Sequence, residues 1–242
     1  MDPRDGLIVA LDTPSLEGAE GLADRLRGAV RWFKVGSELY TAAGPTAVAA
    51  LRSRGRVFLD LKFHDIPTTV AGAVAAAARH GADLCTVHAA GGAAMMRAAQ
   101  DAAARTAVSG RSPLRVIAVT LLTSGDERVI HEVGIAGTPL EVAVRLGTLA
   151  REAGLSGVVA SPLEVRAIKA ACGPDFLVVC PGIRLEGGAA DDQRRVLTPG
   201  AAVAAGADML VVGRPITRAP DPREAAEEIL RQMRDARRPP GD

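Results

Sequence analysis

The chain has few aromatic residues, and its positive and negative charges nearly cancel. Of its 242 residues only four are Phe, one is Tyr and one is Trp. So few rings argue against stacking platforms for single-stranded nucleic acid. The 29 basic and 28 acidic residues leave a net charge of +1, which gives no electrostatic footprint for nucleic acid or for an anionic membrane. The core must be built from Ala, Val, Leu and Ile.

Cysteine is also scarce, and long apolar runs are missing. Cys85, Cys172 and Cys180 are odd in number and lack metal-ligand spacing, which argues against a disulfide framework and favours reduced thiols. Residues 1–12 carry acids before a short apolar run and no basic region, unlike a signal peptide. The most apolar segment, 70–78, is too short to span a bilayer. We therefore expect a cytoplasmic protein.

The chain shows no sign of a boundary between domains. No linker rich in Pro, Gly or Ser and no run of like charge interrupts it. Single α/β barrels commonly reach roughly 200–250 residues. We therefore expect one domain over residues 1–242, with a frayed tail at 237–242.

Short apolar runs alternate with longer segments that are rich in Ala and in charge. This rhythm predicts βα units around a parallel sheet that is covered on both faces. Eight such units favour an α/β fold of the closed (β/α)8 TIM-barrel type, with its active site at the C-terminal ends of the strands. An open sheet with fewer strands is the alternative, weakened because no G-x-G-x-x-G follows the first run. The expected strands are 7–12, 31–36, 56–63, 84–89, 115–122, 157–162, 176–183 and 209–216.

One helix start is marked clearly near the C-terminus. Asp221 offers an N-cap and Pro222 a first-turn proline. The following residues, 223–238, place acids early and arginines late, which matches the helix dipole. We therefore expect a helix that begins at this proline.

Polar residues gather at the expected C-terminal strand ends. Asp60 and Lys62 are two residues apart, so we expect both to face into the barrel while the alternating apolar residues face the helices. Inward-facing charges must be paired, and Lys34 on the neighbouring strand can complete the set. A buried ion-pair network that only fixes the fold is the alternative, but two apolar side chains would do that without a desolvation cost.

A metal site is another interpretation of this cluster. Asp60 and Asp65 carry carboxylates of the kind that bind Mg²⁺, but Lys34 and Lys62 already supply positive charge there. His64 has no second histidine nearby in the sequence, so we interpret it as a polar contact near the rim. The sequence therefore favours a site without a metal ion.

A phosphate site is expected after the seventh and eighth strands, as in many barrels. Gly213 lets the backbone approach an anion, and Arg214 can bind it through two parallel donors. The segment 182–196 is polar, rich in glycine and longer than most loops of its kind. Its length and composition suit a lid that closes over the ligand.

The stretch "LDLKFHDIPTTV" contains D-x-K-x-x-D-I-P and resembles the signature of the orotidine 5′-phosphate decarboxylase family. The resemblance to the compact bacterial type continues, in order, through "VALD", "FKVG", "VTLLTS", "CPGIR", "DDQRRVLTP" and "GADMLVVGRPIT". It implies a (β/α)8 barrel, a homodimer with sites at the interface, and no cofactor or metal. The implied reaction converts orotidine 5′-phosphate into UMP and carbon dioxide, the last step of de novo pyrimidine biosynthesis.

The resemblance also implies roles for the matching residues. Lys62 resembles the lysine that protonates C6 of the substrate, and Asp60 resembles the acid beside the substrate carboxylate. Lys34 resembles the lysine that pairs with this acid, and Asp12 the acid that binds ribose hydroxyls. The remaining implied contacts to base, phosphate and lid are Thr123, Pro181, Arg184, Gln193, Gly213 and Arg214. The residues implied to reach the partner subunit's site are Asp65, Ile66 and Thr69.

Two rival functions stay open. A Mg²⁺-dependent sugar-phosphate decarboxylase or hexulose-phosphate synthase also resembles D-x-K-x-x-D, but those relatives lack the continuation seen at His64-Asp65-Ile66-Pro67. A non-catalytic nucleotide-binding barrel is the second rival. Intact acidic and basic residues throughout the motif argue against it.

Overall fold

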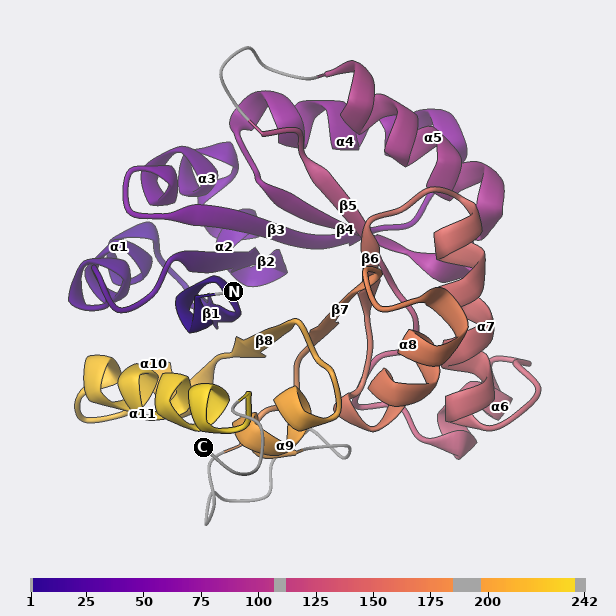
Figure 1. Cartoon of the computed structure of the whole chain (residues 1–242). Coiled ribbons are helices and arrows are strands. Elements are labelled where there is room, and N and C mark those ends of the chain that lie inside the picture. The colour runs from indigo at the N-terminus through magenta and orange to yellow at the C-terminus, as the bar shows by residue number, and fades with distance from the viewer. Residues whose placement is uncertain (1, 107–111, 185–196, 238–242) are drawn as a thin grey trace.

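The fold is a closed barrel of eight parallel strands, each paired with the next, with β1 closing against β8 (Figure 1). The computed structural model describes residues 2–106, 112–184 and 197–237. The predicted (β/α)8 barrel is confirmed. Its strands are β1 Leu7–Ala10, β2 Trp32–Gly36, β3 Arg56–Phe63, β4 Leu84–His88, β5 Arg115–Val119, β6 Gly157–Val159, β7 Leu177–Cys180 and β8 Met209–Val212.

Helices form an outer layer around these strands (Figure 1). Asp221 caps the last of them, because its side chain accepts from the backbone N–H groups of Arg223 and Glu224, as its sequence predicts. The helices are α1 Leu16–Arg25, α2 Ser37–Ala43, α3 Pro45–Arg52, α4 Pro67–His80, α5 Gly92–Arg105, α6 Glu127–Glu132, α7 Pro139–Glu152, α8 Val165–Cys172, α9 Pro199–Ala204, α10 Arg214–Thr217 and α11 Pro222–Asp235. Short 3₁₀ turns are η1 Pro3–Asp5, η2 Ala89–Gly91 and η3 Pro162–Glu164. No helix in the described part of the chain is both long and apolar enough to cross a membrane.

Most strands end earlier than the apolar runs suggest. The run 209–216 predicts one strand, but β8 stops at Val212 and α10 begins at Arg214, with Gly213 as its N-cap. The run 157–162 likewise yields only β6 and then η3. Proline lacks the N–H that a ladder needs, and Pro162 and Pro215 lie in the first turns of these short helices. The early stops leave backbone and side chains free to form the mouth of the barrel.

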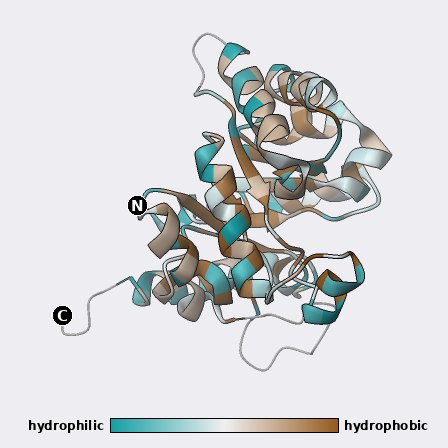
Figure 2. Ribbon diagram, turned by 90° about the vertical axis from the view of Figure 1, so that its right-hand side faces the viewer, coloured by the Kyte–Doolittle hydropathy of each residue, from teal (hydrophilic) through white to brown (hydrophobic). Residues whose placement is uncertain are grey.

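The strands are apolar on both faces, and hydrophobic residues accordingly concentrate in them (Figure 2). The outer face packs under the helices, and it includes Phe33 and Leu59. The inner face fills the barrel with Ile8, Ala10, Trp32, Phe58, Leu84, Ile117, Val119, Val159, Leu177, Val179, Met209 and Val211. Two of the chain's few aromatic rings, Trp32 and Phe58, therefore fill the barrel interior.

Candidate active site

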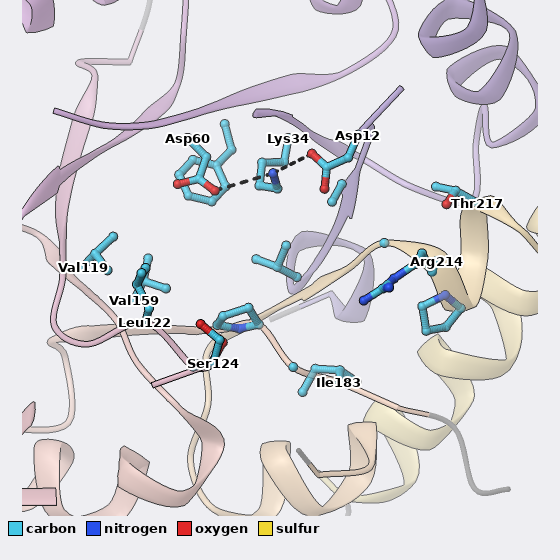
Figure 3. A pocket seen from close by; sticks show the side chains of 18 of the residues that line it. Asp12, Lys34, Asp60, Val119, Leu122, Ser124, Val159, Ile183, Arg214 and Thr217 are labelled. Atoms are coloured by element: carbon cyan, nitrogen blue, oxygen red, sulfur yellow. Dashed lines mark hydrogen bonds and ion pairs between the residues drawn. The ribbon is translucent and has the colours of Figure 1, made fainter. Parts of the chain in front are cut away.

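A cavity of about 520 Å³ opens at the C-terminal ends of the strands (Figure 3). Its volume lies in the range of small-molecule sites, roughly 300–1,000 Å³. Its floor is the upper end of the inner cluster, which includes Phe58, Val119 and Val159. The structure brings these predicted site residues together on its walls: Asp12, Lys34, Asp60, Lys62, Thr123, Pro181, Arg184, Gly213 and Arg214.

Four charged side chains on one wall form an alternating array. The Nζ atom of Lys34 lies 3.0 Å from Oδ1 of Asp12 and 3.5 Å from Oδ2 of Asp60. The Nζ atom of Lys62 donates to the same Oδ2 of Asp60 at 2.9 Å. Figure 3 shows Lys34 between the two carboxylates. The array therefore alternates in sign, from Asp12 through Lys34 and Asp60 to Lys62.

The array is partly withdrawn from water. Lys34 and Asp60 are each only 8% exposed, whereas the side chain of Lys62 is 37% exposed and reaches into the cavity. Burial alone would raise the pKa of Asp60, but the charges of Lys34 and Lys62, with hydrogen bonds from Lys62 and Thr86, bring that pKa below its usual value. Asp60 is therefore a carboxylate at neutral pH, and the two ammonium groups have a fixed negative partner.

The backbone that carries Lys62 departs from a regular strand. The register of β3 against β4 shifts between Leu59 and Phe63. Lys62 has φ 52°, and no other non-glycine residue that the structure describes has a positive φ. Left-handed backbone is costly for a side chain with Cβ and is concentrated at functional sites. The side chains still alternate as predicted: Asp60 and Lys62 line the cavity, and the apolar residues between and beside them pack on the outer cluster. The register shift of the backbone was not predicted.

Gly36 is a site residue that sequence reasoning missed. It is the last residue of β2, two positions after Lys34. A Cβ atom at this position would lie 2.7 Å from both Oδ1 of Asp12 and Nζ of Lys34. The absence of a side chain therefore lets this ion pair form. The "FKVG" run contains the signal, but only the fold shows which atoms occupy the space.

The opposite side of the cavity is basic. Arg214, at the start of α10, lies across the cavity from Lys34, close to Thr217 (Figure 3). Arg184 and Arg218 also line the cavity, and sequence reasoning missed Arg218 and Thr217. An arginine fork matches the oxygens of a phosphate group. Gln193, predicted to be a lid contact, and nearly all of the predicted lid 182–196 lie outside the described residues.

Three predicted residues do not line the cavity of their own chain. Asp65 and Ile66 follow β3, and Thr69 lies in the first turn of α4. All three are exposed, Ile66 by 64%. Oδ1 of Asp65 accepts from the N–H of Ile66 at 2.6 Å. Their part in the site of another subunit stays a prediction.

Two histidines lie beside the array. The rings of His64 and His88 stack with centroids 5.3 Å apart and planes inclined by 20°. Burial, followed by the proximity of His64 and Lys62, lowers the pKa of His88. Among the described residues, no three His, Cys, Asp or Glu side chains are arranged to hold a metal ion. The structure shows a ring contact of His64, and the polar contact expected for it stays a prediction.

The sequence matches one family over most of its length. The model of the Orotidine 5′-phosphate decarboxylase / HUMPS family matches residues 5–229. A relative from Moorella thermoacetica named orotidine 5′-phosphate decarboxylase is 54% identical over 236 residues, covering 96% of this chain and 94% of the relative. A relative of the same name from Trichlorobacter lovleyi is 50% identical over 233 residues, covering 96% of each.

The chain is also similar to solved structures over nearly its whole length. The crystal structure of orotidine 5′-phosphate decarboxylase from Lactobacillus acidophilus has a TM-score of 0.84 and 37% identity, over 94% of this chain and 98% of that one. An uncharacterized conserved protein from Geobacillus kaustophilus has a TM-score of 0.83 and 43% identity, over 94% of this chain and 99% of that one. The similarity therefore covers the barrel and its mouth together.

Proposed function

The chain belongs to the orotidine 5′-phosphate decarboxylase / HUMPS family, and we propose that it converts orotidine 5′-phosphate into UMP and carbon dioxide in this cavity. The family name covers two activities, and relatives at 54% and 50% identity over nearly the full chain carry the first. The observation that carries the proposal is the alternating array, which places the Lys62 ammonium against Asp60 at the cavity wall.

Lys62 is the proposed proton donor. When the bond between C6 and the carboxyl carbon breaks, its electron pair stays on C6 and carbon dioxide leaves. No neighbouring group delocalises that charge, so fixed electrostatic stabilisation must lower the barrier. The ammonium of Lys62 stabilises the forming carbanion, then gives its proton to C6 and becomes a neutral amine.

Asp60 has a double role in this proposal. Its carboxylate fixes Lys62 through the 2.9 Å hydrogen bond and stays ionised because of its lysine neighbours. A substrate carboxylate placed beside it would be repelled, and this repulsion is lost when neutral carbon dioxide forms. Val119 and Val159 line the apolar floor of the cavity, where neutral carbon dioxide is favoured over a carboxylate.

The remaining groups are proposed to bind the rest of the nucleotide. Asp12 and Lys34 bind ribose hydroxyls, and Thr123 contacts the base. Arg184, Gly213 and Arg214 bind the phosphate, joined by Gln193. Contacts so remote from C6 supply binding energy that can be used to orient the reacting groups.

We also propose that two copies of the chain share their sites. Asp65, Ile66 and Thr69 then reach the cavity of the partner subunit, which agrees with their exposure outside their own cavity. The enzyme is proposed to act in the cytoplasm without metal or cofactor. The three cysteines are buried and unpaired, which fits a reducing compartment.

A direct test follows the loss of orotidine 5′-phosphate absorbance with purified protein, with and without EDTA. We expect equal rates in both, and a Lys62→Ala variant at least about 10²-fold slower, since general acid catalysis contributes roughly 10²–10⁴-fold. Lys62→Arg is the matched control, because it keeps the positive charge but holds its proton too tightly to donate it. We expect it to bind UMP and to turn over poorly. Activity only on a sugar phosphate, and only with Mg²⁺, would contradict the proposal.

A further inference from the structure

Thr86 is a fully buried polar residue on β4, and neither its sequence context nor the roles proposed above assign it a function. Its exposed fraction is 0%. Its Oγ1 atom donates to Oδ1 of Asp60 at 2.9 Å and accepts the backbone N–H of Lys62 at 2.9 Å. One hydroxyl therefore joins the carboxylate of Asp60 to the backbone of Lys62, the last two residues of the array.

The strand register explains why this hydroxyl is needed. Leu59 pairs with Cys85 and Phe63 pairs with Val87, so Asp60, Leu61 and Lys62 of β3 all lie opposite the single residue Thr86 of β4. A bulge of this kind leaves backbone groups without a ladder partner. The N–H of Lys62 would be one of them, and Thr86 supplies its acceptor from a side chain. A buried N–H donor without an acceptor lowers the stability of the folded protein.

The same hydroxyl completes the fixation of Asp60. Oδ2 of Asp60 faces the Nζ atoms of Lys62 and Lys34, at 2.9 Å and 3.5 Å. Oδ1 is held by Thr86. A hydroxyl has one hydrogen, and giving it to Asp60 leaves its lone pairs for the N–H of Lys62. The carboxylate is thus held at both oxygens, and its plane cannot turn without breaking a contact.

We propose that Thr86 is a positioning residue of the decarboxylase: its hydroxyl holds the Lys62 bulge and the Asp60 carboxylate together in the geometry that the reaction needs. Thr86 does not line the cavity, so it acts through these two residues and not on the substrate. Displacing a preorganised group by even about 1 Å can cost roughly 10²-fold in rate. This inference rests on the proposed function, because it assigns Lys62 and Asp60 the roles given there.

Thr86→Val is the central test, since valine has the shape of threonine and lacks the hydroxyl. We expect kcat to fall about 10- to 100-fold, while the Kd for UMP changes less than about threefold, because the phosphate and ribose contacts are untouched. Thr86→Ser keeps the hydroxyl and should restore kcat to within about threefold of wild type. The backbone amide hydrogen of Lys62 should exchange with solvent faster in Thr86→Val than in wild type, and it should exchange at the wild-type rate in Thr86→Ser.

Thr120→Val is the matched control. Thr120 is also 0% exposed and does not line the cavity, and its hydroxyl donates to the backbone carbonyl of Val159 at 3.0 Å instead of to the charged array. Its loss removes an equally buried hydrogen bond, so it reports the general cost in thermal stability. We expect Thr120→Val to lower Tm about as much as Thr86→Val and to keep kcat near wild type.

The outcomes separate the two proposals. A wild-type protein that does not decarboxylate orotidine 5′-phosphate defeats the proposed function itself. An active wild type with Thr86→Val at wild-type kcat, or with Thr86→Ser as slow as Thr86→Val, defeats only the positioning role. If Thr86→Val does not fold, Thr86→Cys replaces it. Its weak S–H donor predicts a lower kcat than Thr86→Ser, and equal rates in these two variants would overturn the role.

Discussion

At the scale of single residues, the site depends on small groups as much as on the charged ones. Lys34 can lie between Asp12 and Asp60 only because Gly36 leaves the space open. The φ of Gly36 is −93°, which any residue adopts, so the glycine is required for space and not for backbone freedom. Its role is therefore separable from folding.

Gly36→Ala tests this separation. The added methyl group meets only the ends of two flexible side chains, so we expect Tm to change little and the contact between Lys34 and Asp12 to be displaced. KM for the substrate should rise about tenfold, which corresponds to losing one hydrogen bond to a charged group. Steady-state kinetics and thermal melting measure both. Gly21→Ala in α1 is the control, since nothing lies within 4 Å of its added Cβ; an equal change of KM in both variants would argue against the steric role.

Sequence reasoning found the four charged residues of the array and missed the residues that place them. Asp60 and Lys62 stand out because charge is unexpected in an apolar strand. Thr86 and Gly36 do not, since threonine and glycine are ordinary in strands and strand ends. Their roles depend on which atoms lie opposite them, and the register shift between β3 and β4 could not be read from alternation.

At the scale of elements, the order of strands and helices was predictable and the strand ends were not. Buried residues also follow both strands, since Ala160 after β6 and Ile216 after β8 are each 0% exposed, so hydrophobicity does not mark where the ladder stops. The start of a helix is easier to predict than the end of a strand, because it depends on residues close in sequence. The N-cap of α11 is an example, since Asp221 makes its hydrogen bonds within three residues.

Asp221→Ala should destabilise the protein through this helix. We expect a loss of about 0.5–2 kcal/mol in the free energy of unfolding, the usual effect of removing an N-cap. Urea denaturation followed by circular dichroism measures it. Asp235→Ala, at the other end of α11, is the matched control: a carboxylate there opposes the helix dipole, so its removal should cause no loss. Equal destabilisation by both variants would contradict the cap's role.

At the scale of the whole molecule, the array of one chain is proposed to be completed by a second chain. Asp65→Asn and Lys62→Ala should each be nearly inactive alone. When the two variants are mixed in equal amounts and allowed to exchange subunits, half of the dimers are hybrids. Each hybrid has one site in which both residues are intact. Activity should therefore recover to about a quarter of wild type in a symmetric dimer. Each variant exchanged with itself is the control, and no recovery in the mixture would contradict a shared site.

The pairing of β1 with β8 has a consequence for how the protein is made. Leu7 pairs with Leu210 and Val9 with Val212, so the barrel cannot close until β8 has left the ribosome. Until then one edge of β1 has no partner strand, and such an edge is the kind of surface through which growing chains aggregate. The same seam separates Asp12 from Arg214, which follow these two strands. Closure of the barrel therefore brings together the two ends of the proposed nucleotide site, and a substrate that contacts both ends as proposed would favour the closed form.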